Sequence, residues 1–215
     1  MPTTDIYTIK GLKKGKVSLP SNIFAGKINP ALMAQAIRVY LSNQRMALAK
    51  VKSRGEVSFS TRKIYKQKGT GRARHGGKGA PIFVKGGRAH GPTGTQNFKL
   101  KLSKKMKKLS LFSALTSKFK ENEIMVIDGF EKIEPKTKEM IKVFKNLKLY
   151  KAKEVKKEEK KGKSKKNKLN LKVLIVLPKG LENIVRAGRN IPQVKIMQAK
   201  QLNTYKVLNG GKLLI

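Results

Sequence analysis

Apolar positions along the chain follow two periods, and a long stretch with neither period separates the regions that carry them. The first region opens with alternating segments at residues 6–9 and 17–19, which predict a β-hairpin across a Lys/Gly turn. Asn29 and Pro30 then predict the start of a helix. Apolar residues at three- and four-residue spacing continue to Leu41, so we expect a helix with one buried face that ends between residues 44 and 49.

The second region begins with another predicted helix, for which Ser103 is the expected N-cap. Lysines occupy the rest of this segment, so we expect them on the face opposite an apolar stripe. The predicted stripe consists of Met106, Leu109, Phe112, Leu115 and Phe119.

Short apolar strands and helices then alternate as far as the last residues. We expect strands at 124–127, 171–177, 194–197 and 212–215, with helices at 136–147, 181–189 and 203–208. This alternation predicts an α/β layered domain with a mainly parallel central sheet flanked by helices. The segment 173–177 is apolar on both faces, so we expect it at the centre of the sheet. We therefore expect a single α/β domain over residues 1–215.

Two segments interrupt this pattern. Residues 50–100 are rich in glycine and poor in large apolar side chains, and Glu56 is the only acid between Asp5 and Glu121. We expect residues 50–100 to form an extended loop that orders on a polyanion and is disordered without one. Residues 151–168 mix Lys and Glu and predict a Lys-rich solvated insertion.

The charge balance identifies the class of partner. There are 51 Lys and Arg against 12 Asp and Glu, a net charge of +39. Such a chain is expected to bind nucleic acid with a steep salt dependence. A membrane surface is the alternative polyanion, but there is no apolar run of transmembrane length, and the basic residues do not line one amphipathic helix. We expect no membrane partner.

Cysteine and histidine are too few for a structural metal site. The chain has no Cys and only two His, so we expect no disulfide, no metal and no cofactor. The first residues contain neither a hydrophobic signal core nor an amphipathic leader. We therefore expect the protein to work in the compartment where it is made.

The loop combines aromatic and cationic side chains. Phe59, Tyr65, Phe83 and Phe98 alternate with Arg and Lys, which would allow base stacking beside phosphate neutralisation. Alternatively, Phe59 and Phe98 hold the loop to its own body. The two histidines are expected to stack, to hydrogen-bond or to be solvated. The candidate RNA-binding residues are Arg45, Arg54, Arg62, Lys63, Lys66, Lys68, Arg72, Arg74, His75, Lys78, Lys85, Arg88 and His90.

Catalytic alternatives have weaker support. The run from Gly71 to Lys78 resembles a P-loop, but it has one extra residue and lacks the hydroxyl that would hold magnesium. The turn after residues 124–127 lacks the Rossmann glycines. A nuclease would need acids that converge on the substrate, whereas the acids cluster at Glu121, Glu123, Asp128, Glu131 and Glu134, outside the basic loop. A nuclease remains the alternative hypothesis, and we expect no catalytic residues.

Several motifs together resemble one known family. The central motif is Gln67-Lys68-Gly69-Thr70-Gly71-Arg72-Ala73-Arg74. The others, in order, are Asn43-Gln44-Arg45, Ser53-Arg54-Gly55-Glu56-Val57, Ala80-Pro81, Gly86-Gly87, Gly91-Pro92, Ser113-Ala114-Leu115, Glu134-Pro135-Lys136-Thr137-Lys138, Lys172-Val173-Leu174-Ile175-Val176-Leu177, Arg189-Asn190, Val194 and Tyr205. This series is similar to the bacterial-type large-subunit ribosomal protein L-four family over nearly the whole chain.

The resemblance implies a non-catalytic protein of the large ribosomal subunit in the cytoplasm, which binds large-subunit rRNA and supports its assembly. It implies that Gln67, Lys68, Gly69, Thr70 and Gly71 form a loop tip facing the nascent-peptide exit tunnel. It also implies that Arg72 and Arg74 hold rRNA phosphates, and that neighbouring ribosomal proteins and the nascent peptide are further partners. Tyr65 departs from the family, which usually has tryptophan there.

Overall fold

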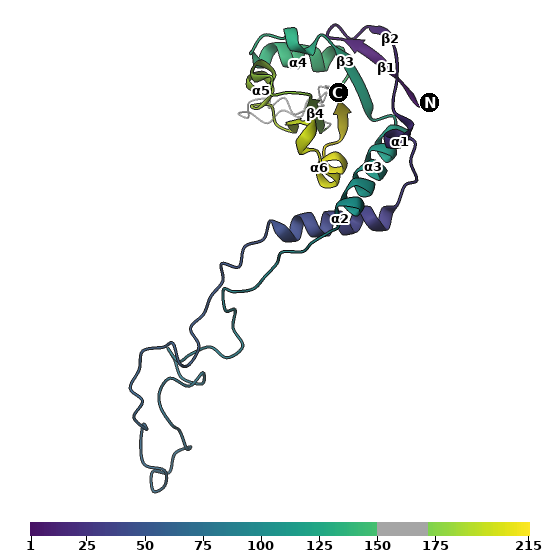
Figure 1. Ribbon diagram of the computed structural model, residues 1–215. Coiled ribbons are helices and arrows are strands. Elements are labelled where there is room, and N and C mark those ends of the chain that lie inside the picture. Colours follow the sequence, from purple (N-terminus) through teal and green to yellow (C-terminus); the bar gives the residue numbers. More distant parts are fainter. Residues whose placement is uncertain (150–171) are drawn as a thin grey trace, which may run out of the picture. The chain divides into compact units, whose positions relative to one another are not determined.

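The computed structural model describes residues 1–149 and 172–215, so the predicted insertion at 151–168 lies outside the described residues. The chain divides into two compact units (Figure 1). The first, which we call the body, comprises Met1–Arg38 and Leu102–Ile215. The second, which we call the loop unit, comprises Val39–Lys101. Each is described here by itself.

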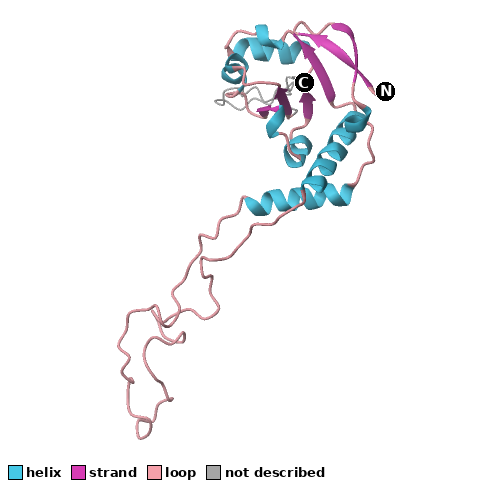
Figure 2. Cartoon of the chain, in the orientation of Figure 1, coloured by secondary structure: helices cyan, strands magenta, loops and turns pink. Residues whose placement is uncertain are grey.

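In the described part of the body, six strands form one sheet in the order β2-β1-β3-β6-β4-β5 (Figure 2). Their bounds are β1 Thr3–Thr8, β2 Lys13–Ser18, β3 Ile124–Asp128, β4 Val173–Leu177, β5 Val194–Gln198 and β6 Lys212–Leu214. The hairpin partner β2 is antiparallel to β1, and every other pairing is parallel. The predicted α/β class with a mainly parallel sheet is confirmed.

Helices cover both faces of the sheet. The described helical segments are α1 Ser21–Phe24, α2 Pro30–Asn43, α3 Lys104–Lys120, α4 Thr137–Asn146, α5 Glu182–Gly188 and α6 Thr204–Asn209, with 3-10 turns η1 Phe130–Lys132 and η2 Ala199–Gln201. Residues from α4, α5 and η1 share one apolar cluster, and residues from α1, α3 and α6 share the other. The sheet therefore forms the middle of three layers.

Strand β4 is apolar throughout because both of its faces are covered by helices. Val173, Ile175 and Leu177 belong to the cluster with α4 and α5, while Leu174 and Val176 belong to the cluster with α3 and α6. All five residues are buried, because alternate side chains enter the two layers. The strand is paired on both sides, by β5 and β6, but it lies second from the edge of the sheet, so the predicted central position is wrong.

Two glycines before β6 allow this strand to lie between β3 and β4 without a steric clash. A Cβ on Gly210 would lie 2.7 Å from the Cβ of Leu174, and one on Gly211 would lie 2.2 Å from the carbonyl oxygen of Lys172. Gly211 also has a φ of +70°, which only glycine adopts readily. The chain can therefore turn from α6 into β6 while touching β4.

Helix α3 begins as predicted, since the Ser103 hydroxyl accepts a hydrogen bond from the Met106 amide. Its predicted apolar stripe is wrong in part, because Leu109 is 52% exposed. The buried face instead carries Ser110, Ser113 and Thr116. Their hydroxyls are satisfied, with Ser113 donating to the Lys27 carbonyl at 3.2 Å. Small paired hydroxyls thus replace leucine at this contact.

The Thr116 hydroxyl connects α3 to α1 and to the segment that follows it. It donates to the Ile23 carbonyl at 3.1 Å and accepts from the Gly26 amide at 3.3 Å. The short helix α1 was not predicted. Lys118, which the pattern assigned to the solvent-facing side, is also buried, and its ammonium pairs with Glu123.

The loop unit has no strand and no helix after the end of α2 at Asn43 (Figure 2). The side chain of Asn43 exchanges two hydrogen bonds with the backbone of Leu100, at 3.1 Å and 2.8 Å. The Ser42 hydroxyl donates to the Phe98 carbonyl at 2.6 Å. Two adjacent side chains at the end of the helix thereby fasten the returning arm of the loop to the outgoing one.

Candidate nucleic-acid interface

Every arginine and lysine predicted to bind RNA is exposed in the loop unit, and so is His90. His75 is the one predicted residue that is half-buried. The loop therefore presents its cations outward, where phosphate groups can reach them.

These cations have few partners within the protein. The Arg45 guanidinium lies 4.2 Å from the ring centre of Phe98, and the Lys63 ammonium donates to the Gln67 side chain. Among the described residues, the other predicted arginines and lysines form no ion pair. Their charge is left uncompensated, as a polyanion-binding surface requires.

The single carboxylate of the loop unit, that of Glu56, accepts hydrogen bonds within a turn. Glu56 accepts from the Ser53 amide at 2.8 Å and from the Ser53 hydroxyl at 2.9 Å, and the Lys50 ammonium lies 3.7 Å away. The Ser53 hydrogen bonds, and then the charge of Lys50, lower the pKa of Glu56 below its ordinary value. Glu56 therefore shapes the loop and neutralises little of its charge.

Three aromatic side chains of the loop pack on one another. The ring centres of Tyr65 and His75 are 6.3 Å apart, and those of His75 and Phe83 are 5.1 Å apart, both in edge-to-face geometry. The Tyr65 hydroxyl donates to the Ala73 carbonyl. The loop thus brings His75 together with Tyr65 and Phe83, so their rings have neighbours without any base stacked on them.

Backbone hydrogen bonds join the two arms of the loop. The Val51 amide donates to the Pro92 carbonyl at 3.0 Å, and the Arg88 amide donates to the Lys52 carbonyl at 2.9 Å. Nearer the tip, the Ile64 amide donates to the Gly76 carbonyl at 3.2 Å. The loop unit is an irregular hairpin whose two arms are joined by backbone hydrogen bonds.

Most glycines of the loop fall into two groups, with Gly77 and Gly94 between them. A Cβ on Gly79 would lie 2.2 Å from the Phe59 ring, and one on Gly86 would lie 2.0 Å from the Ala80 carbonyl oxygen. A Cβ on Gly87 would likewise clash with the backbone of Arg54, and one on Gly91 would clash with the side chain of Val51. By contrast, a Cβ at several other loop positions would meet nothing within 4 Å, namely at Gly55, Gly69, Gly71 and Gly76.

The predicted tip residues, Gln67 to Gly71, are all exposed. Gly69 and Gly71 have φ values of +82° and +64°, so the turn at the tip needs glycine for its backbone conformation. The space around both remains open. The tip therefore exposes backbone on which another molecule could lie closely.

Asp128 and Glu134, two of the acids that a nuclease could use, are each held in an ion pair by a lysine of the body. Asp128 pairs with Lys14 at 2.5 Å, and Glu134 pairs with Lys136 at 2.8 Å. The hydrogen bond from each lysine lowers the pKa of its carboxylate partner, whereas a general base near neutral pH needs a raised pKa. In residues 1–149 and 172–215, no three His, Cys, Asp or Glu group together in a way that could hold a metal ion.

None of the helices in the described ranges has the length and apolarity that a membrane span needs.

A comparison with family models decides the identity of the chain. Residues 17–215 match the model described as the ribosomal protein L4/L1 family. The chain belongs to this family.

Relatives in the L4/L1 family match the chain along its full length. "Large ribosomal subunit protein uL4" of Thermoanaerobacter sp. (strain X514) is 39% identical over 215 residues, covering 100% of this chain and 94% of the relative. The proteins of the same name from Thermosipho melanesiensis and Carboxydothermus hydrogenoformans are 40% identical over 228 residues and 37% identical over 215 residues, with the same coverage. The resemblance seen in the sequence motifs is confirmed.

Membership of the L4/L1 family also decides between the two classes of function. The family consists of structural ribosomal proteins and not of enzymes. The nuclease alternative is therefore set aside.

Sequence reasoning missed the residues that shape the loop. Ser53 and Glu56 have the Ser-x-x-Glu spacing of a capping box. This spacing usually indicates the start of a helix, and no helix follows it here. The packing of Tyr65, His75 and Phe83 has no signal of this kind, because the three residues follow no period. In this member of the L4/L1 family, the irregular loop is ordered by side-chain and backbone contacts that are visible only in three dimensions.

Proposed function

We propose that this protein is a structural constituent of the large ribosomal subunit that binds large-subunit rRNA through its loop unit. The observation that carries the proposal is the exposed and unpaired charge of the loop, whose only carboxylate is held by Ser53 and Lys50. Phosphates of rRNA would neutralise these cations and release counterions, which is the main source of affinity in such complexes.

The loop's contacts support the proposal in a second way. A loop that is already folded by its own hydrogen bonds loses less conformational entropy on binding than a free chain would. Its open glycines, Gly55 and Gly76 among them, let a ribose or phosphate approach the backbone where a side chain would intervene. Arg72 and Arg74, exposed just after the tip, are proposed to hold phosphates and so to fix the register of the loop on RNA.

The finer part of the proposal concerns the tip. We propose that Gln67, Lys68, Gly69, Thr70 and Gly71 lie at the wall of the nascent-peptide exit tunnel. These residues are exposed, and the space around Gly69 and Gly71 is open, which supports a position at the boundary between rRNA and the tunnel. The nascent peptide and neighbouring large-subunit proteins would then be partners beside the rRNA, and the protein would support assembly by joining RNA segments.

The proposal is tested by sedimentation of a cell lysate through a sucrose gradient at moderate salt. The protein should migrate in stoichiometric amount with the large subunit and leave it only at salt concentrations that strip core proteins. Recovery mainly at the top of the gradient would overturn the proposal. A variant with residues 62–78 replaced by a short Gly/Ser linker should keep a folded body yet move to the free fraction.

The tip requires its own measurement. A nascent chain stalled on the ribosome and carrying a photoreactive residue at successive distances from the peptidyl end should crosslink to Gln67 or Lys68 within a narrow window of chain lengths. Crosslinks to other tunnel components alone, with none to this tip, would contradict the tunnel position and leave the rRNA-binding proposal intact.

A further inference from the structure

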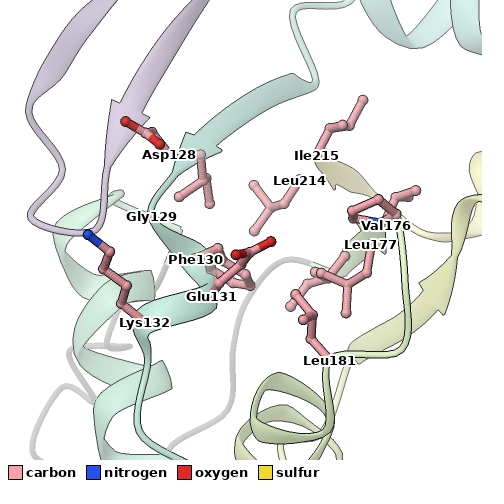
Figure 3. A pocket seen from close by; sticks show the side chains of 13 residues that line it. Asp128, Gly129, Phe130, Glu131, Lys132, Val176, Leu177, Leu181, Leu214 and Ile215 are labelled. Carbon is pink, nitrogen blue, oxygen red and sulfur yellow. The ribbon is translucent and has the colours of Figure 1, made fainter.

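A cavity of about 430 Å³ lies in the body at the carboxyl ends of three parallel strands. Its walls are mostly apolar and include Ile127 of β3, Leu177 of β4, Leu214 of β6, Phe130 and Leu181 (Figure 3). A volume of this size is in the range of binding pockets. The carboxyl ends of parallel strands are also where α/β folds commonly leave a crevice.

One carboxylate belongs to this cavity. Figure 3 shows the Glu131 side chain among the lining side chains, whereas the Asp128 carboxylate points away from them. Asp128 already pairs with Lys14 on the neighbouring hairpin. Glu131 therefore supplies the available negative charge at the mouth of the cavity.

Within the described residues, Glu131 is the one carboxylate with neither an ion pair nor a hydrogen bond. The paired acids and their partners are Asp5 with Lys13, Glu56 with Ser53, Glu121 with Ser117, Glu123 with Lys118, Asp128 with Lys14, Glu134 with Lys136, Glu139 with Lys142 and Glu182 with Arg186. The chain has 51 Lys and Arg for 12 acids, so an unpaired carboxylate is unusual in it.

The chemistry of this site favours a protein partner over RNA. A carboxylate repels phosphate, and the mostly apolar walls offer a phosphate oxygen few donors. Lys132 also lines the cavity, but its ammonium points away from the other lining side chains (Figure 3). An inserted apolar side chain would instead bury the walls of the cavity, and a neighbouring Lys or Arg would pair with Glu131.

We propose that this cavity docks a basic segment of another ribosomal protein, with an apolar side chain inside it and a cation on Glu131. The inference rests on the proposed function, because it assumes that the protein lies next to other ribosomal proteins in the large subunit. It assigns the two units different partners, since the loop unit meets RNA and this side of the body meets protein.

The test uses large subunits purified from cells whose only copy of the protein carries the photocrosslinker p-benzoylphenylalanine in place of Leu181. The matched control carries it at Val185, which is 38% exposed on α5 and does not line the cavity. Position 181 should crosslink to one ribosomal protein, through a peptide with Lys or Arg next to an apolar residue. Position 185 should not yield that product.

The charge is tested by combining the crosslinker with Glu131→Lys and Glu131→Gln. Glu131→Lys should lower the yield about fivefold, because repulsion replaces attraction, and Glu131→Gln should lower it less. If the crosslinker at 181 prevents incorporation, position 215 is used, because Ile215 also lines the cavity and is 42% exposed.

Several outcomes would overturn the inference. Crosslinks from both lining positions to rRNA, to the same chain, to a second copy of it or to nothing would each do so, as would a yield that Glu131→Lys leaves unchanged. Sedimentation of the same samples separates the two proposals. Absence of the wild-type protein from large subunits overturns the proposed function, whereas incorporation without a protein crosslink overturns this inference alone.

Discussion

The body and the loop unit are ordered by different kinds of contact. In the body, apolar side chains are buried on both faces of a sheet, and Phe144 and Leu174 are fully inaccessible. In the loop unit, the buried positions are Val39 on the helix and two glycines, Gly79 and Gly87. Side-chain burial therefore stabilises the body, whereas close backbone approach and hydrogen bonds order the loop.

This difference means that the same protein should respond to substitution in two ways. Loss of a buried side chain should unfold the body cooperatively, because the two clusters share the strands of one sheet. A change in the loop should alter only local opening and RNA binding, because few apolar contacts depend on it.

The largest effect is expected from Phe144→Ala. Phe144 is 0% exposed in the cluster with α4 and α5, so the change should lower the free energy of unfolding by about 3–5 kcal/mol. Urea denaturation followed by far-UV circular dichroism measures this loss. The control is Phe83→Ala in the loop, which should leave the midpoint of body unfolding nearly unchanged. Equal losses for the two variants would remove the distinction between the units.

A smaller and local effect is expected from Gly86→Ala. The new Cβ would meet the Ala80 carbonyl oxygen at 2.0 Å, so the loop backbone must shift, at a cost of about 1–3 kcal/mol in local stability. The Phe83 and Gly87 amides, which donate within this turn, should exchange faster with deuterated solvent. The matched Gly76→Ala variant places its Cβ in open space and should exchange like the wild type.

The same pair of glycine variants also probes RNA binding. If rRNA lies against Gly76, then Gly76→Ala should weaken binding although the free protein is unaffected. Unchanged binding by Gly76→Ala would show that RNA does not lie against this glycine, and unchanged binding by Gly86→Ala would show that the turn around Gly86 is not needed for binding.

Arg72→Ala and Arg74→Ala should each reduce the slope of log affinity against log salt by about one, because each removes one proposed phosphate contact. Filter binding or fluorescence anisotropy with large-subunit rRNA at several salt concentrations gives the slope. Arg186→Ala serves as the control, since Arg186 already pairs with Glu182 in the body at 3.1 Å. A slope that stays the same after loss of either loop arginine contradicts its role as a phosphate ligand.

The smallest effect concerns pH and Glu56. Its pKa is lowered by the hydrogen bonds from Ser53 and by Lys50, so the turn it holds is fully stabilised above the ordinary pKa near 4.5. That stabilisation is lost as pH falls through the lower pKa of the folded loop. The amide proton resonance of Ser53 should move over this acidic range and stay constant in Glu56→Gln. A titration at or above the ordinary pKa would contradict the proposed hydrogen bonds.

The sequence predicted the regular parts of the molecule because hydrophobic period and cap residues are local signals. Ser103 begins α3, Asn29 accepts from the Leu32 amide at the start of α2, and the apolar run at β4 is an interior strand. The positions of loop cations on the surface followed from composition, since so many like charges cannot be buried together.

The errors came from contacts that no period encodes. The α3 stripe failed at Leu109 because paired hydroxyls of Ser113 and Thr116 occupy the buried face, and the pattern equates buried with apolar. The packing of His75 between Tyr65 and Phe83 depends on how the irregular arms fold back. Such contacts depend on tertiary geometry that residue spacing does not specify.

The insertion of β6 between β3 and β4 constrains the order in which the body can form during synthesis. Before residues 212–214 leave the ribosome, the sheet can exist only as two separate pieces, β2-β1-β3 and β4-β5, each with an open edge. Strand β6, the last of the described strands, joins these pieces and covers both edges. A newly made copy therefore depends on β6 to avoid pairing with another chain, and termination before residue 212 would leave it prone to aggregation.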